Sequence, residues 1–173
     1  MSDAAANDKA LIDEIVTFRD GLDSICIATL NDDGEPEASY APFVTDHHSN
    51  VFVFISGLAA HTRNLENKSS AGLMFIEDEA GAANAFARRR LLYQCRAEPV
   101  ARETDTWKEV MLLFEKRFGP FMATLQALPD FRLFRFVPYR GSYITGFGKT
   151  YRLAGDELGE ISPVLPGTAN EDQ

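Results

Sequence analysis

The stretch VFVFISGLAAHTRNLENK, residues 51–68, places an apolar run directly before a cluster of polar donors. Its first six residues have the length and the β-branched and aromatic content of a buried strand. In its last nine residues, 60–68, Leu65 lies among polar side chains in a pattern that suits a short helix. We therefore expect a buried strand that leads directly into a short helix.

Segments of period two surround this stretch on both sides, and segments of helical period are few. Asp33–Gly34 forms the turn of a predicted hairpin. The predicted strands are residues 24–30, 37–45, 51–56, 71–77, 89–102, 131–138 and 141–153. The predicted helices are residues 8–20, 60–68 and 104–128, the last broken at Gly119–Pro120. Six to seven antiparallel strands in hairpin succession predict a mostly β fold, a β-barrel with flanking helices.

The composition is that of one acidic, folded domain. The chain has 173 residues, a net charge of −9 and 45% hydrophobic residues, which is enough to form a core. We expect a single domain at residues 1–155 and a flexible acidic tail at residues 156–173, which contain few large apolar side chains. The negative charge argues against binding to nucleic acid or to anionic membranes.

No segment of the sequence has the pattern of a signal peptide or of a membrane span. The first residues, MSDAAANDKALIDE, contain acids and lack an apolar core. The longest apolar stretch, VFVFISGLAA, has about half the length of a transmembrane helix. We therefore expect a cytoplasmic protein that does not enter a membrane.

The residue types that usually perform catalysis are scarce. Cys26 and Cys95 lie in apolar runs, so we expect both to be buried, reduced thiols. The sequence has no CxxC motif or Cys/His cluster, which argues against a zinc site, and no GxSxG or HExxH motif. His47 and His48 lie in a polar turn, where we expect both to be exposed. Any redox chemistry would then come from a bound cofactor.

The start of the helix at residues 60–68 is a candidate anion site. A helix N-terminus offers unpaired N–H groups, to which Thr62 and Ser56 could add hydroxyl donors and Arg63 a charged contact. The alternative is a solvated helix start, in which Arg63 pairs with Glu66 and His61 is exposed.

Three further motifs also allow two interpretations. In AFARRRLLY, Arg88 and Arg90 share one strand face and could meet an anion, or they could protect a strand edge. In SYAPFV, Pro42 predicts an opening in the ladder or a plain edge strand. In ITGFGKTYR, Gly146 and Gly148 allow close approach of a ligand or form a simple kink.

These motifs occur in an order that resembles a known family. The series ATL, SYAPFV, FISGLAAHTRNLE, FIEDE, FARRRLLY, KRFG, LPDFRLFRF and GFGKTYRL is similar to the pyridoxamine 5′-phosphate oxidase-like, FMN-binding split-barrel superfamily. The likeness spans residues 8–155 and is greatest to the HugZ/HutZ haem-utilisation branch. It implies a split β-barrel that forms a homodimer, with ligand grooves at the interface.

The resemblance implies an FMN-binding flavoprotein, an oxidoreductase that acts on a small-molecule redox substrate. It places the flavin ring along Ala41, Pro42 and Phe43. The cofactor's phosphate end and its remaining polar contacts would then involve Ser56, His61, Thr62, Arg63, Asn64 and Arg90.

The alternative implied by the same resemblance is a haem-binding or haem-degrading protein. Arg63 and Arg90 would then meet the haem propionates. Haem-binding members take their iron ligand from a histidine in a C-terminal extension, whereas no histidine follows Tyr151 here, so His61 is the candidate ligand. This difference favours FMN. A carrier or sensor without catalytic activity is the third interpretation.

Overall fold

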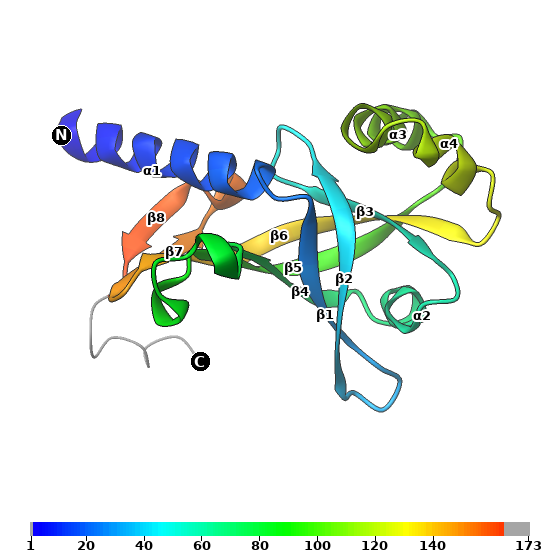
Figure 1. The fold of residues 1–173 in the computed structure, drawn as a ribbon, viewed down its shortest axis with the longest axis horizontal. Coiled ribbons are helices and arrows are strands. Elements are labelled where there is room, and N and C mark those ends of the chain that lie inside the picture. The colour runs from blue at the N-terminus through cyan, green and yellow to red at the C-terminus, as the bar shows by residue number, and fades with distance from the viewer. Residues whose placement is uncertain (1, 165–173) are drawn as a thin grey trace.

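Four α-helices and eight strands form the chain over residues 2–164, which the computed structural model describes, with side chains from residue 7 onward (Figure 1). The helices are α1 (Ser2–Asp20), α2 (Ala60–Asn67), α3 (Asp105–Phe118) and α4 (Phe121–Gln126). The strands are β1 (Ser24–Leu30), β2 (Pro36–Thr45), β3 (Val51–Ser56), β4 (Ser70–Ile76), β5 (Arg90–Val100), β6 (Phe131–Gly146), β7 (Lys149–Ala154) and β8 (Glu160–Pro163). Short 3-10 turns are η1 (Glu79–Gly81), η2 (Ala85–Ala87) and η3 (Asp156–Leu158).

Six of the strands close into an antiparallel barrel. Hydrogen-bonded neighbours follow the order β3–β2–β1–β4–β5–β6, and β3 pairs with β6 to complete the circle. β7 and β8 extend the sheet beyond β6, outside the barrel. The predicted mostly β fold, an antiparallel barrel with flanking helices, is therefore confirmed.

The barrel opens at Pro42, as one interpretation of SYAPFV predicts. β2 pairs with β1 as far as Pro42, and its pairing with β3 begins at Phe43. Proline has no N–H to give to a ladder, so it suits the position at which the strand changes partners. The edge of β2 from Pro36 to Ala41 that points away from β1 is thereby left without a strand in the described chain.

β3 shows why residues 51–56 are apolar without alternation. Val51, Val53 and Ile55 belong to the core inside the barrel. Phe52 and Phe54 lie on the opposite face and pack with apolar side chains of α3 and α4, which cover this part of the barrel (Figure 1). A strand that is buried on both faces needs apolar side chains on both.

β6 is one strand of 16 residues, so the prediction of separate strands at residues 131–138 and 141–153 was wrong. The chain reverses only after β6, at a turn where Gly148 has a φ of 71°. Pro138 does not end the strand because it lies beside a bulge in the β5–β6 ladder, where a missing N–H is tolerated.

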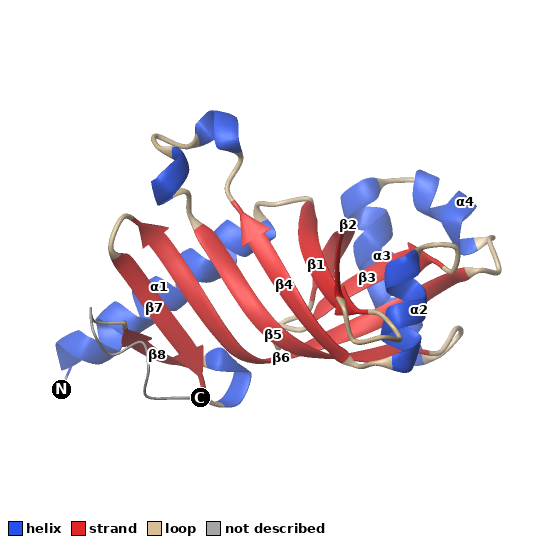
Figure 2. Cartoon of the chain, turned by 90° about the horizontal axis from the view of Figure 1, so that it is seen from below, coloured by secondary structure: helices blue, strands red, loops and turns tan. Residues whose placement is uncertain are grey.

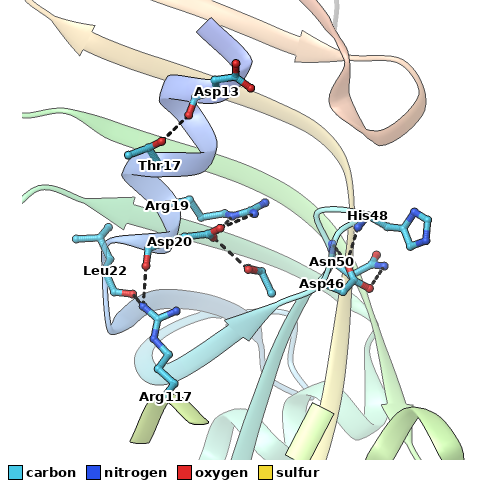
Figure 3. A network of polar contacts seen from close by, with 10 residues as sticks. Asp13, Thr17, Arg19, Asp20, Leu22, Asp46, His48, Asn50 and Arg117 are labelled. Carbon is cyan, nitrogen blue, oxygen red and sulfur yellow. Dashed lines mark hydrogen bonds and ion pairs between the residues drawn. The ribbon is translucent and has the colours of Figure 1, made fainter. Parts of the chain in front are cut away.

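α1 covers the sheet on one side and is fixed at its C-terminal end. The Phe18 ring packs against Tyr143, with 5.7 Å between ring centroids. Arg19 is 3% exposed, and its Nε donates to the Asp20 carboxylate at 2.8 Å. Arg117 of α3 donates to the Asp20 carbonyl at 3.0 Å, so that α1, α3 and the barrel meet at this point (Figure 3).

The segment after β7 is more ordered than the expected flexible tail. Residues 156–158 form η3, and β8 returns antiparallel to β7. The prediction from sequence missed this short strand because Glu160–Pro163 offers few apolar side chains and no alternation. The rest of the expected tail, residues 165–173, lies outside the described residues.

Candidate functional site: a groove on the open face of the sheet

One face of the sheet formed by β1, β4, β5, β6 and β7 carries none of the four α-helices (Figure 2). α1 lies on the opposite face. We call the uncovered side the open face. It contains a groove with a free volume of about 610 Å³, within the range of pockets that hold small molecules and cofactors.

The strand registers place the groove residues in two rows that run across the open face. The first row is Tyr40, Cys26, Met74, Leu92, Ser142 and Arg152. The second row is Ala38, Ala28, Gly72, Gln94 and Arg140. Most of the central side chains are small or apolar, so the floor of the groove can accept a flat apolar molecule.

Cationic side chains lie on the same face. Arg140 is exposed at the end of the second row. Arg90 precedes Leu92 by two positions in β5, so both point to the open face. Pro42 likewise follows Tyr40 by two positions in β2. Of the predicted site residues, Pro42 and Arg90 therefore lie on the open face.

Arg90 differs from the two arginines before it, which are bound to Glu77. Arg88 Nε donates to the Glu77 carbonyl at 3.0 Å, and Arg89 Nε donates to the Glu77 carboxylate at 3.1 Å. The backbone N–H of Arg89, with its guanidinium, lowers the pKa of Glu77. Arg90 Nη1 donates to the Arg88 carbonyl at 3.1 Å, which restrains the Arg90 guanidinium.

The hydroxyl and amide donors near α2 bond to other groups of the chain. Ser56 Oγ donates to the Asp130 carboxylate at 2.7 Å, and Thr62 Oγ1 donates to the Ser56 carbonyl at 2.6 Å. Asn64 Nδ2 donates to Glu37 at 2.7 Å and also to Thr29 at 3.0 Å. Of these three predicted phosphate ligands, Thr62 and Asn64 therefore hold α2 against the barrel, and the Ser56 side chain connects the end of β3 to Asp130.

Arg63 and His61 are available on the surface of α2. Arg63 is exposed and makes no hydrogen bond or ion pair within residues 2–164. The alternative pairing of Arg63 with Glu66 is not formed, because Glu66 lies 3.7 Å from Arg132 of β6 instead. His61 is half-buried, and desolvation lowers its pKa, so the imidazole is neutral near pH 7.

A single protomer does not bring α2 and Arg90 together. α2 leads into β4, whose first residue, Ser70, pairs with Arg96 of β5. Arg90 is six residues away along β5, about 20 Å at the rise of a strand. Ala41 and Phe43, which the flavin interpretation places along the ring, are buried in the core.

Most residues of the groove could not be recognised from the sequence. Cys26 is exposed, so the prediction that both cysteines are buried was wrong for Cys26 and correct for Cys95. Cys26 alternates with Ile25 and Ile27, which fill the barrel, and therefore faces the groove. One feature of the sequence does indicate the groove, because β5 carries apolar side chains on both of its faces. Leu91 is buried in the core, and Leu92 lines the groove.

Residues 2–164 contain neither a cluster of metal-binding side chains nor a helix that could span a membrane. No three His, Cys, Asp or Glu side chains of that part of the chain gather where they could hold a metal ion. None of its helices is long and apolar enough to cross a membrane.

Comparison with known proteins identifies the family of this chain. The family model described as pyridoxamine 5′-phosphate oxidase matches residues 11–145, so the chain belongs to that family.

The chain is 41% identical over 145 residues to the haem oxygenase HutZ of Vibrio cholerae serotype O1, covering 84% of this chain and 82% of HutZ. Its structure resembles that of V. cholerae HutZ, described as a haem storage protein, with a TM-score of 0.72, 39% identity, and coverage of 77% of this chain and 92% of the other. It also resembles Campylobacter jejuni ChuZ, with a TM-score of 0.82, 29% identity, and coverage of 93% of this chain and 66% of ChuZ.

Proposed function

We propose that this protein binds haem in the groove of the open face and degrades it. The groove is the observation on which the proposal rests, because it combines a small, apolar floor with arginines on the same face. Haem is a flat apolar ring with two carboxylates, so its chemistry matches both features. The names of the V. cholerae relatives, a haem oxygenase and a haem storage protein, point the same way.

The same geometry favours haem over FMN. A flavin phosphate needs several donors, and the predicted ones on Ser56, Thr62 and Asn64 already donate to other groups of the chain. Haem needs fewer polar contacts, and Arg90 and Arg140 are placed to meet carboxylates at the open face. Each charged contact of this kind contributes about 1.5–3 kcal/mol.

His61 is our candidate for the iron ligand. Iron binds the neutral form of imidazole, and desolvation holds His61 in that form near pH 7.

We also propose that the complete site needs two copies of the chain. His61 and Arg63 lie on α2, about 20 Å along the sheet from Arg90 by the rise of a strand. In a two-fold symmetric dimer that pairs the open faces, α2 of one copy can approach the Arg90 end of the other. A homodimer would also cover the apolar floor of the groove, which is otherwise open to water.

In this scheme the protein contributes binding and orientation, and the haem iron supplies the reaction with O₂. Arg90 and Arg140 hold the carboxylates, and the apolar floor excludes water from the ring. Ser142 and Gln94 are the neutral polar groups that line the groove. The haem is then both the cofactor and the small-molecule redox substrate.

Absorbance titration of the purified protein with hemin and, separately, with FMN tests the proposal. We expect a Soret band that saturates at one hemin per groove, a dimer in size-exclusion chromatography, and loss of the band after addition of ascorbate in air. Stoichiometric FMN uptake without hemin binding would overturn the haem assignment. A stable Soret band under reducing conditions would support a carrier instead of an enzyme.

A groove-filling variant locates the site. Ala28→Trp puts an indole on the groove floor, where Ala28 is exposed, and should abolish hemin binding while preserving the fold. Ala123→Trp, on the exposed surface of α4, is the matched control and should bind as the parent does. Equal hemin binding by both variants would exclude the groove.

A further inference from the structure

The segment after β7 forms one edge of the groove. We call residues 155–164 the arm; it contains η3 and β8. β8 pairs with β7 over the length of the short strand, and the N–H of Val164 donates to the Thr150 carbonyl at 2.9 Å. Val164 lines the groove beside Arg152. Movement of the arm would therefore change the shape of the groove.

The arm is anchored at its start by Leu158. This side chain is 6% exposed and belongs to the main core cluster, which also includes Ile15 of α1 and Leu153 of β7. A small cavity of about 30 Å³ lies at the anchor, lined by Leu158, by Ile12 and Ile15 of α1, and by Ser49 of the β2–β3 loop. The junction between the arm, α1 and this loop is thus not fully packed.

The backbone is strained on both sides of the same junction. Over residues 2–164 four non-glycine residues have a positive φ, and three of them lie here: Ser49 at 63°, Glu157 at 52° and Leu158 at 59°. The left-handed region is unfavourable for side chains with a Cβ, and leucine has no polar group to compensate. The arm therefore depends on its contacts to remain in place.

One of those contacts is a histidine–carboxylate pair. His48 Nδ1 lies 2.6 Å from Glu157 Oε1 and connects the β2–β3 loop to η3. The loop itself is ordered by Asp46, whose carboxylate accepts from the N–H groups of His48 at 2.9 Å and Asn50 at 3.0 Å (Figure 3). His48 is thereby held in position to meet η3.

We propose that the His48–Glu157 pair is a pH-sensitive latch that holds the arm against the barrel and so sets the shape of the haem groove. This inference rests on the proposed function for its biological meaning, but the latch itself depends only on contacts within the chain. With the imidazole protonated, the pair is ionic and the arm is closed. With the imidazole neutral, a single hydrogen bond remains and the strained arm opens more often.

The surroundings of His48 leave Glu157 as its ionic partner. The His47 ring lies tilted against the His48 ring, with 3.9 Å between the ring centroids. The Asp46 carboxylate, on the same loop, accepts from the backbone N–H of His48. From α1 the residues that line the junction are apolar, such as Ile12 and Ile15. Histidine changes charge between pH 5 and 8, so closure is strongest near pH 5.5 and weakest near pH 8.

Hydrogen exchange measured by mass spectrometry tests the latch without any ligand. We expect a peptide that covers residues 159–164 to open about two- to five-fold more often at pH 8 than at pH 5.5, after correction for intrinsic exchange, as suits an exposed ion pair. Glu157→Gln and His48→Gln should abolish this difference, whereas His47→Gln should keep it. Equal opening at both pH values in the parent, or an unchanged pH response in Glu157→Gln, would overturn the latch.

A second measurement connects the latch to the groove. If the groove binds hemin, the association rate in the parent should rise with pH in parallel with opening of the arm, and Glu157→Gln should remove that rise. A protein that shows the exchange pattern but binds no hemin would refute the proposed function and leave the latch intact. A protein that binds hemin but lacks the exchange pattern would refute the latch and leave the proposed function intact.

Discussion

Asn64 of α2 donates a hydrogen bond to the carboxylate of Glu37 in β2, 2.7 Å away. Asn64 is 4% exposed, and the same amide nitrogen reaches Thr29 of β1 at 3.0 Å. A buried amide thus joins α2 to the β1–β2 hairpin. The AHTRN segment therefore has two roles that alternate along the helix: Thr62 and Asn64 anchor it, and His61 and Arg63 remain available to a ligand.

Replacement of Asn64 by alanine should destabilise the fold. The change leaves the Thr29 hydroxyl and the Glu37 carboxylate without this buried partner, which costs about 1–3 kcal/mol. Urea unfolding followed by circular dichroism measures the loss. Asn67→Ala is the matched control, because Asn67 donates to Asp32 at 2.9 Å at an exposed site, and it should change stability by less than about 0.5 kcal/mol. Equal effects of the two variants would contradict the anchoring role.

Replacement of Arg63 by alanine, unlike replacement of Asn64, should leave the stability of the fold unchanged and weaken hemin binding. Arg63 has no partner within residues 2–164, so we expect unfolding free energies within about 0.5 kcal/mol of the parent. If Arg63 meets a haem carboxylate, hemin affinity should fall by about 1.5–3 kcal/mol, or roughly 10- to 150-fold. Lys108→Ala, an exposed site on α3, is the control for a simple change in net charge. Unchanged hemin affinity in Arg63→Ala would remove Arg63 from the site.

His61 should make the protein less stable in acid. Desolvation lowers the pKa of His61 in the folded state, so the unfolded chain binds this proton more tightly. Its contribution to stability is therefore fully present above the ordinary pKa of about 6.5 and is lost as the pH falls through the folded pKa. Unfolding free energies at pH 7.5, 6.5 and 5.5 should decline less steeply for His61→Gln than for the parent. Parallel declines would show that His61 is not desolvated.

The fold could be predicted from sequence because most of its elements have strong local signals. The turn at Asp33–Gly34 and the buried run at residues 51–56 appear where the sequence places them. The helix predicted from residue 104 begins there as well, because the Thr104 hydroxyl accepts from the N–H of Trp107. Pro138 gives the pattern of a strand end, but it is tolerated within β6 because of a bulge in the β5–β6 ladder, which the local sequence does not reveal.

The site was harder to predict because its residues come together through strand register. Leu92, Met74 and Cys26 come from three strands and become neighbours only when the sheet forms. A sequence motif also does not show whether a hydrogen-bond donor faces a ligand site or bonds to another group of the same chain. Thr62 and Arg63 are adjacent in sequence, yet one is buried and the other exposed.

The two cysteines should differ sharply in reactivity. Burial raises the pKa of the Cys95 thiol to about 12, whereas Cys26 is exposed in the groove. In the native protein we expect iodoacetamide to modify Cys26 alone, with Cys95 modified only after unfolding. Excess hemin should slow the modification of Cys26 at least several-fold if haem occupies the groove. Peptide mass spectrometry identifies the modified residue, and equal labelling of both thiols in the native state would contradict the fold at β1 or β5.

Gly141 should tolerate no side chain, although it lies within a regular strand. A Cβ at this position would come within 2.9 Å of the Tyr93 ring and 3.0 Å of the Leu92 carbonyl, and the backbone carbonyl cannot move without disturbing the β5–β6 ladder. We expect Gly141→Ala to cost about 1–3 kcal/mol in urea unfolding. Gly146→Ala is the matched control, because nothing lies within 4 Å of a Cβ there, and it should be close to neutral. Since Leu92 also lines the groove, Gly141→Ala should weaken hemin binding even where the variant remains folded, and Gly146→Ala should not.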